Sequence, residues 1–326
     1  MSFSDIKGHN NITHFFKRAM ALKKVPSSYI FFGPDGIGKT LMAATVAKAL
    51  NCLREAADSC DNCASCVKIE NKNHPDVVWL RIHDKKDAIS IEQIRDLQRQ
   101  INLKPYEART KVFIIQDSHL MSEAAANCLL KTLEEPPRNS IIILITPKVE
   151  ELLMTVRSRC SQIKFEPLES RLKVELTQNL GFLKDEALFL SRLGNSGISI
   201  SRGIKAGALL AYKNKVLDEF NSGKNLLDEN SFVFDESKNN INFIIAVLGS
   251  WFRDILLLKA GAPGSLIINS DRIGELKSLK DSFSFEGLEN ALRKIGDAQF
   301  YIERNVGPKL ALNKLKMELV ARKAEA

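Results

Sequence analysis

The stretch that decides the fold reads Tyr29-Ile30-Phe31-Phe32-Gly33-Pro34-Asp35-Gly36-Ile37-Gly38-Lys39-Thr40. Its first four residues form an apolar run typical of a buried strand, and the glycine-rich part that follows matches a phosphate-binding loop. Residues 41–50 continue with a helical pattern, which would present the positive end of a helix to an anion. A loop retained only for structure is the alternative, but the flanking strand and helix favour nucleotide binding.

Each part of the loop has an expected role. The glycines let the backbone turn its N–H groups toward phosphate oxygens. Lys39 would reach the terminal phosphates, and Thr40 would hold Mg²⁺. We therefore predict a site for ATP or ADP with Mg²⁺ that is formed by Gly33, Pro34, Asp35, Gly36, Ile37, Gly38, Lys39 and Thr40.

Length and charge limit the class of protein. A chain of 326 residues is too long for one ordinary core and predicts two or three domains. Its 44% apolar and 26% charged residues are typical of a globular protein. With 47 Lys and Arg against 39 Asp and Glu, the net charge is +8. On charge alone, a DNA-binding face and a solvated basic surface are equally good interpretations.

Nothing in the sequence indicates export. The first residues contain no basic stretch that leads into an apolar one, so we expect no secretion signal. We also expect no membrane association. Spanning a bilayer takes roughly 18 consecutive apolar residues, and we expect no stretch of this sequence to come near that length. A cytoplasmic location follows, and in that reducing compartment the six cysteines are not expected to form structural disulfides.

Four of the cysteines lie close together in the sequence. Cys52, Cys60, Cys63 and Cys66 have the spacing Cys-x7-Cys-x2-Cys-x2-Cys. Two-residue spacings let both sulfurs of a pair turn toward one ion, and four thiolates leave no open coordination position. The pattern predicts a structural Zn²⁺ site; redox-active thiols and chance clustering are the alternatives. Cys128 lies far from this cluster, among leucines at helical spacing, and is interpreted as a small core residue.

Apolar runs that alternate with helical segments predict a mostly parallel sheet with helices on both faces. Ser122 is a plausible cap of one of these helices, and Pro136 stops that helix because proline cannot donate the next backbone bond. The predicted strands are residues 30–32, 77–81, 111–116 and 141–146. After Leu168 the patterns become helical. We predict domains at 1–168, 169–206 and 207–326, with the cysteine insertion at 52–66 in the first.

Four features together resemble the AAA+ subunits of the bacterial DNA polymerase III clamp loader, the gamma/tau and delta-prime proteins. They are the phosphate loop, the cysteine cluster, the segment LLKTLEEPP at residues 129–137 and Arg157-Ser158-Arg159-Cys160. The segment NVGPKLAL at residues 305–312 adds a weaker match to delta-prime. The resemblance implies an AAA+ P-loop module, a small helical lid and an all-helical collar. It also implies a heteropentameric ring with gamma/tau and delta subunits, which acts on a sliding clamp and on primer-template DNA.

The resemblance also raises the question of whether this chain hydrolyses ATP. Hydrolysing members carry an Asp-Glu pair after an apolar strand, where the Asp holds Mg²⁺ and the Glu orients water. Here Gln116 and Asp117 occupy these positions. Gln116 lacks the charge that a dication site requires, and Asp117 is one methylene shorter than Glu. Strand alternation would also point the two side chains to opposite faces. These substitutions predict weak or absent hydrolysis, with Asp117 retained beside the nucleotide.

Arg159 is the residue that we expect to act on chemistry. In the family, the Ser-Arg-Cys element supplies an arginine finger in trans, and Ser158-Arg159-Cys160 matches it. A guanidinium is always charged and can bind phosphoryl oxygens with two parallel hydrogen bonds as negative charge develops. A surface salt bridge is the alternative for Arg159, and Arg157 is a second candidate for the finger.

Two functions from different classes follow. The first is a delta-prime-like scaffold that closes one end of the ring, lends Arg159 to its neighbour and hydrolyses little ATP. The second is a short gamma-like subunit that hydrolyses ATP itself. A lid segment that carries a nucleotide-sensing Arg in hydrolysing members is best matched by residues 195–200, which contain no Arg; Arg202 lies beyond it. This difference and Gln116 both favour the scaffold.

Overall fold

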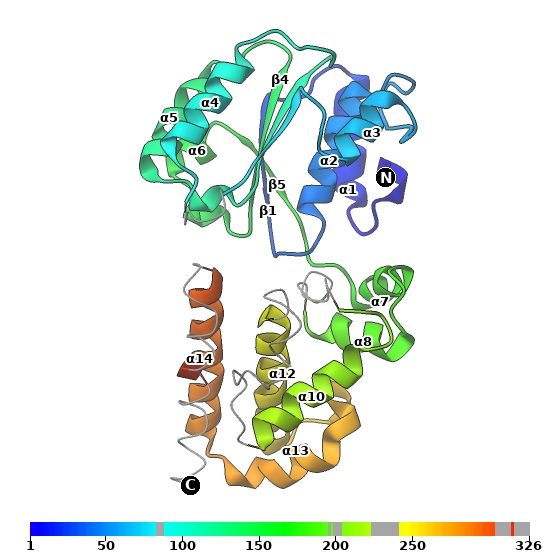
Figure 1. The fold of residues 1–326 in the computed structure, drawn as a ribbon, viewed down its shortest axis with the longest axis vertical. Coiled ribbons are helices and arrows are strands. Elements are labelled where there is room, and N and C mark those ends of the chain that lie inside the picture. Colours follow the sequence, from blue (N-terminus) through cyan, green and yellow to red (C-terminus); the bar gives the residue numbers. More distant parts are fainter. Residues whose placement is uncertain (83–87, 195–196, 198–203, 223–240, 304–313, 316–326) are drawn as a thin grey trace. The chain divides into compact units, whose positions relative to one another are not determined.

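The fold is that of a computed structural model, which describes residues 1–82, 88–194, 197, 204–222, 241–303 and 314–315. The chain divides into two compact units, Met1–Glu169 and Ser170–Ala326 (Figure 1). Within the second unit, Phe189 and Leu190 belong to the same apolar core as Leu209 and Trp251. A further boundary at residues 206/207, and hence the three-domain division, stays a prediction.

The first unit is built on one parallel sheet with the strand order β2-β3-β4-β1-β5. Its strands are β1 Ser28–Phe32, β2 Val77–Leu80, β3 Lys111–Ile115, β4 Ser140–Thr146 and β5 Ser161–Lys164. Tyr29 of β1 pairs with Ile143 of β4 on one side and with Ser161 of β5 on the other. Because all strands run in one direction, their carboxyl ends meet at one edge of the sheet, where β1 enters the phosphate loop and β3 leads to Gln116.

Helices cover both faces of this sheet (Figure 1). Successive residues of β1 point to opposite sides, so Tyr29 and Phe31 pack in one core and Ile30 in the other. The first core includes residues of α1 Asn10–Ala21, α2 Lys39–Asn51 and α3 Ala64–Glu70. The second includes residues of α4 Ile91–Ile101, α5 Glu123–Glu134 and α6 Met154–Arg157. This arrangement confirms the predicted α/β class.

The second unit is helical over its described residues. Its helices are α7 Ser170–Asn179, α8 Lys184–Arg192, α10 Leu209–Asn221, α12 Ile241–Lys259, α13 Ile273–Leu279 and α14 Phe285–Glu303. Short 3-10 helices lie in the first unit at Phe3–Asp5, Ser118–Leu120 and Val149–Glu151, and in the second at Gly264–Leu266, Ser270–Arg272 and Lys280–Ser282. Trp251 of α12 is 1% exposed at the centre of the apolar core of this unit. A helical region after the sheet agrees with the predicted architecture.

The predicted strands all exist, with small shifts at their ends. β3 ends at Ile115, one residue before the predicted end, and β2 ends at Leu80. Strand β5 was not predicted. Its sequence, Ser161-Gln162-Ile163-Lys164, contains one apolar residue, and its side chains alternate between half-buried and exposed. Ser122 caps α5 as predicted, since its hydroxyl accepts from the Ala125 N–H at 3.2 Å, and α5 ends at Glu134, before Pro136.

Helix α12 corrects the expectation that no segment is apolar enough to cross a bilayer. Its 19 residues include an 18-residue window with a mean hydropathy of 1.7, which passes that test by length and composition. In the fold, however, 61% of this window is buried, and Asp254 within the helix is fully buried, accepting from the N–H groups of Ile268 and Asn269 at 3.1 and 2.7 Å. These contacts are those of a core helix.

Candidate functional site: a phosphate loop, a paired arginine and a four-cysteine cluster

The phosphate loop has the backbone that its glycines predict. Gly33 and Gly38 have φ values of +136° and +101°, which glycine adopts without a steric cost. A Cβ atom at Gly33 would also lie only 2.3 Å from the carbonyl oxygen of Phe165. Gly38 caps the amino end of α2, so the loop leads directly into a helix whose first N–H groups can bind an anion.

Lys39 turns back into the loop. Its side chain is 5% exposed, and its Nζ donates to the carbonyl oxygen of Gly33, to that of Pro34 at 2.8 Å and to Asp35 Oδ1 at 3.3 Å. Burial lowers the pKa of Lys39, whereas the carboxylates of Asp35 and Asp117 oppose this change. The two carbonyl oxygens and Asp35 hold the Lys39 amino group inside the loop, at the position where a phosphate would bind.

A buried histidine supports the loop from α1. His9, which is 4% exposed, lies 2.7 Å from the carbonyl oxygen of Ile37 through its Nε2. Because a carbonyl only accepts, Nε2 carries the proton. Burial lowers the pKa of His9, so the ring stays neutral near pH 7. Its edge packs on the ring of Phe165 at 4.9 Å between centroids, which fixes the loop to the end of β5.

Asp117 lies at the same edge of the sheet as the loop. β3 ends before Gln116, and Asp117 adopts a left-handed conformation with φ 50° and ψ 43° at the start of a 3-10 turn. The alternation argument for these two side chains therefore fails, because neither lies within the strand. Loss of water raises the pKa of Asp117, and nearby Asp35 adds to this rise while His119 and Lys39 oppose it. The fold thus brings Asp117 into the electrostatic neighbourhood of Lys39.

Arg159 lies at the amino ends of the strands, whereas the phosphate loop lies at their carboxyl ends. It precedes Ser161, the partner of Tyr29, whereas the phosphate loop follows Phe32. The three residue steps of strand between these points span about 10 Å. The Arg159 guanidinium bonds Glu134 Oε1 through Nε at 2.8 Å and Nη2 at 2.6 Å, and Nη1 donates to the Thr155 carbonyl at 2.8 Å. The salt bridge is therefore present, on a side chain that stays one-third exposed.

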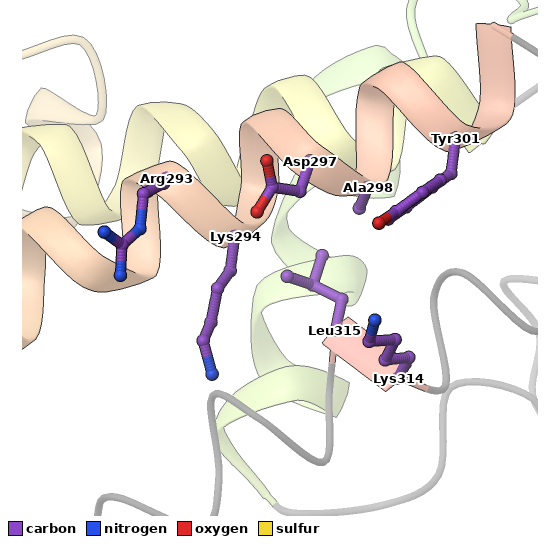
Figure 2. A pocket seen from close by; sticks show the side chains of 7 residues that line it. All are labelled: Arg293, Lys294, Asp297, Ala298, Tyr301, Lys314 and Leu315. Atoms are coloured by element: carbon purple, nitrogen blue, oxygen red, sulfur yellow. The ribbon is translucent and has the colours of Figure 1, made fainter.

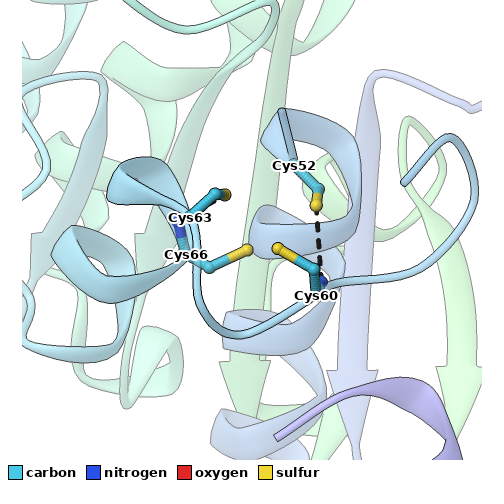
Figure 3. A group of neighbouring side chains, drawn as sticks. All are labelled: Cys52, Cys60, Cys63 and Cys66. Carbon is cyan, nitrogen blue, oxygen red and sulfur yellow. Dashed lines mark hydrogen bonds between the residues drawn. The ribbon is translucent and has the colours of Figure 1, made fainter. Parts of the chain in front are cut away.

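The four clustered cysteines meet between the end of α2 and the start of α3. All four sulfurs lie within 4.8 Å of one another (Figure 3). Four sulfurs at about 2.3 Å from one Zn²⁺ are separated by about 3.8 Å in a tetrahedron, so small rotations about the side-chain bonds suffice. The cluster could hold a metal ion, as the cysteine spacing predicts. Cys128 lies outside it, half-buried against the core, with its S–H directed at Gln98 Oε1 at 3.2 Å.

The surroundings favour thiolates at Cys52 and Cys63, whereas burial, followed by the neighbouring Cys63 and Cys52, raises the pKa of Cys66. Cys52 Sγ accepts from the N–H group of Glu55 at 3.3 Å and from that of Cys60 at 3.4 Å, the bond drawn in Figure 3. Burial opposes ionisation of Cys63, but backbone N–H groups of Leu53 and Cys66 outweigh it and lower its pKa to about 6. Metal ions bind the deprotonated thiol. Sulfur positions and donor chemistry both fit a four-thiolate Zn²⁺ centre.

Helix α2 connects the two sites. It begins at Lys39 of the phosphate loop and ends immediately before Cys52, so its 13 residues separate the sites by about 20 Å. Near its end, Lys48 is 1% exposed and its Nζ bonds Asp61 at 2.8 Å and Glu70 at 2.6 Å. These bonds tie the cysteine segment and α3 to α2. At this distance a metal ion held by the cysteines would not contact a nucleotide in the loop.

A separate hollow of about 270 Å³ lies in the helical unit. Figure 2 shows Arg293, Lys294 and Asp297 extending from α14 toward it, with Lys314 opposite. The Lys314 ammonium lies 5.4 Å from the centre of the Tyr301 ring, a cation–π distance. Three basic side chains against one acidic one make this lining positive.

Several partners of the site were not predicted. These contacts join residues that are far apart in the sequence: Glu134 and Arg159 by 25 positions, His9 and Ile37 by 28, and Lys48 and Asp61 by 13. No local sequence pattern predicts such contacts. Two predicted features lie outside the described residues: the lid segment at 195–200 with Arg202, apart from Gly197, and the delta-prime-like segment at 305–312. Arg157 ends α6, where its carbonyl accepts from Gln162 Nε2 at 3.3 Å.

Comparisons with known proteins agree with this organisation. Residues 8–169 match a family model described as DNA polymerase III, delta subunit, and residues 212–317 match its C-terminal counterpart. The Bacillus subtilis protein named DNA polymerase III subunit delta' is 28% identical over 302 residues, which cover 87% of each chain. B. subtilis subunit tau is 37% identical over 170 residues. These are 52% of this chain but only 30% of tau, and the match to a Buchnera gamma subunit covers 45% of that protein.

Among solved structures, a gamma-subunit-related protein of Thermotoga maritima is 21% identical, with a TM-score of 0.44 and coverage of 95% of this chain and 99% of the other. The T. maritima RuvB branch-migration motor is 13% identical, with a TM-score of 0.41 and coverage of 76% and 74%. Both scores lie below 0.5, so the assignment depends on the sequence matches, which extend through the sheet unit and most of the helical unit. The chain belongs to the DNA polymerase III delta-subunit family.

Proposed function

We propose that this chain is the delta-prime subunit of a bacterial clamp loader and helps to load the sliding clamp onto primed DNA in the cytoplasm. The observation that carries the proposal is the match to B. subtilis delta', which extends over 87% of both chains, whereas the matches to tau and gamma end after about 170 residues. A match along both units indicates a shared mode of assembly. The partners are gamma/tau and delta subunits in a heteropentameric ring, and through it the clamp and primer-template DNA.

In this role the phosphate loop binds ATP or ADP with Mg²⁺ and turns over little of it. Lys39 and the positive end of α2 supply the anion site. Gln116 offers no carboxylate where the dication would need one, and Asp117 is one methylene shorter than the Glu that orients water in hydrolysing members. Binding with slow hydrolysis is the behaviour that these residues support.

Arg159 acts as an arginine finger on the nucleotide of a neighbouring subunit. It lies at the opposite edge of the sheet from the loop of its own chain, and none of its described partners belongs to residues 33–40. The side chain is held by Glu134 and the Thr155 carbonyl yet stays one-third exposed. A guanidinium that is oriented and accessible in this way can contact a phosphate across an interface.

The four cysteines hold a structural Zn²⁺. Cys52, Cys60, Cys63 and Cys66 provide four sulfurs within 4.8 Å of one another, and a metal bound there would fix the segment between α2 and α3. Such a centre supplies cross-linking and no chemistry, because four thiolates leave no open position.

The second candidate is a short gamma-type subunit that hydrolyses ATP. The 37% identity to tau over the first 170 residues favours it, since this is the unit that contains the complete phosphate loop. The two functions predict different behaviour of the purified chain. Steady-state ATPase of the chain alone is near background for the delta-prime role and robust for the gamma role.

A reconstituted loader tests the assembly role directly. The chain is mixed with the gamma/tau and delta subunits of the same organism, and a fluorescent clamp is followed onto primed circular DNA. Omitting the chain should abolish loading. Full loading without it, or failure of the chain to co-purify with the other subunits, would refute the delta-prime role.

A further inference from the structure

The phosphate loop carries an acidic residue that binds the lysine of the same loop. Asp35 Oδ1 lies 3.3 Å from Lys39 Nζ, and the Asp35 side chain is 67% exposed at the mouth of the loop. The other two acceptors of Lys39 are backbone carbonyls, of Gly33 and Pro34. An ammonium group has three N–H donors, and here all three are used by the loop itself.

A phosphate oxygen can bind Lys39 only by replacing one of these acceptors. The two carbonyls belong to the loop backbone and are close to Nζ. Asp35 makes the longest of the three contacts and does so through an exposed side chain that can rotate away. Asp35 therefore occupies the donor that a nucleotide phosphate would take.

The charge around Lys39 acts in the same direction. The Asp35 carboxylate already faces the Lys39 ammonium, and the Asp117 carboxyl group also interacts with it. A free diphosphate adds further negative charge at this point, whereas a divalent cation bound to the diphosphate offsets much of it. The site therefore disfavours the metal-free anion.

We propose that Asp35 is an internal competitor for phosphate: it sets the nucleotide affinity of the loop and restricts the ligand to a nucleoside diphosphate or triphosphate complexed with a divalent cation. This inference rests on the proposed nucleotide binding by the loop. It assigns Asp35 a role in affinity and ligand selection, whereas Lys39 and the loop amides provide the site itself.

Calorimetric titration of the full, zinc-loaded chain with ADP, with and without MgCl₂, tests the proposal. The variants are Asp35→Asn, which keeps the size of the side chain, and Lys39→Ala. Asp96→Asn is the matched control, because it removes one carboxylate from α4 on the other face of the sheet, where Asp96 pairs with Arg99. Asp35→Ala gives a second neutral variant, and circular dichroism verifies that each protein is folded.

Asp35→Asn should tighten the binding of metal-free ADP about tenfold, since a carboxylate near 5 Å from a doubly charged phosphate in water-like surroundings opposes binding by that factor. With Mg²⁺ the gain should fall to about threefold, and high salt should reduce both gains because Asp35 is exposed. Asp96→Asn should bind as the wild type does, and Lys39→Ala should lose binding.

Two results would overturn the proposal and separate it from the proposed function. If Asp35→Asn and Asp35→Ala bind ADP as the wild type does while Lys39→Ala loses binding, the loop binds nucleotide but Asp35 does not compete. If none of the proteins binds ADP at millimolar concentration, both nucleotide binding and the role of Asp35 are wrong.

Discussion

Replacing Cys63 with serine tests the metal centre. The effect of losing the zinc on the free energy of unfolding can be calculated from the structure. Cys63 is 5% exposed, begins α3 as its cap and has a pKa lowered to about 6, so it is a thiolate near neutral pH. Serine keeps the shape and the cap but is a poor Zn²⁺ ligand. We expect the Cys63→Ser protein to lose its zinc, which would otherwise be present at about one ion per chain.

The expected loss of stability follows from the loop that the metal closes. A cross-link across the fifteen residues from Cys52 to Cys66 contributes about 3 kcal/mol to the free energy of unfolding. The two apolar cores of the sheet unit are separate from the cysteine cluster, so the unit should stay folded. For a unit of this size, the loss corresponds to a melting temperature lower by about 6 to 12 °C.

Zinc content measured by mass spectrometry and thermal unfolding followed by circular dichroism provide the assay. Cys128→Ser is the matched control, because Cys128 is a half-buried cysteine outside the cluster whose bond to Gln98 a hydroxyl can replace. It should keep both the zinc and the wild-type melting temperature. Stoichiometric zinc in Cys63→Ser, or a wild-type protein whose melting temperature is the same with and without metal, would refute the reasoning.

Three further predictions concern chemistry and pH. Arg159→Ala should leave the ring intact but abolish turnover at the neighbouring site, since such a finger contributes about a thousandfold; unchanged ATPase of the reconstituted loader would contradict this. Gln116→Asp combined with Asp117→Glu should raise the ATPase of the isolated chain above background if the missing carboxylates limit hydrolysis, and an unchanged rate would show that they do not. Burial opposes ionisation of Asp76, but three backbone N–H bonds of 2.8 to 2.9 Å outweigh it and keep its pKa below the ordinary value. The stability that it contributes is therefore present above about pH 4 and lost as pH falls through the folded pKa. Asp76→Asn should cost about 2 kcal/mol at pH 7, with the difference from wild type shrinking in urea unfolding as the pH falls below about 4.

The sheet could be predicted wherever its strands are uninterrupted apolar runs. β1 and β4 are buried on both faces, which selects Ile, Leu, Phe and Tyr except for Ser or Thr at strand ends and makes the strands visible in the sequence. β5 was not predicted, because it is an edge strand in which only Ile163 is apolar. The helical patterns after Leu168 agree with the second unit, but the apolar length of α12 was underestimated. Burial inside a helical unit permits as much hydrophobicity as a membrane does.

The site could be predicted where its members are neighbours in the sequence. The phosphate loop and the four cysteines are local motifs, and their geometry agrees with the motif. The bonds from Glu134 to Arg159 and from His9 to Ile37 join distant segments, so they depend on the path of the chain and leave no local signature. Asp35 was predicted as a member of the loop, but its pairing with Lys39 depends on how the lysine folds back.

The requirement for glycine at position 33 limits what a retained phosphate-loop motif says about nucleotide binding in other members of the family. Two independent constraints require a glycine there, a backbone φ of +136° and the carbonyl of Phe165 2.3 Å from where a Cβ would lie. Neither constraint involves a ligand, so selection for folding alone would retain this glycine in a descendant that never meets a nucleotide. The divergence that records a lost catalytic role will instead accumulate at exposed side chains such as Asp35, to which neither of these constraints applies. A relative can therefore keep the outline of the motif long after its use has ended.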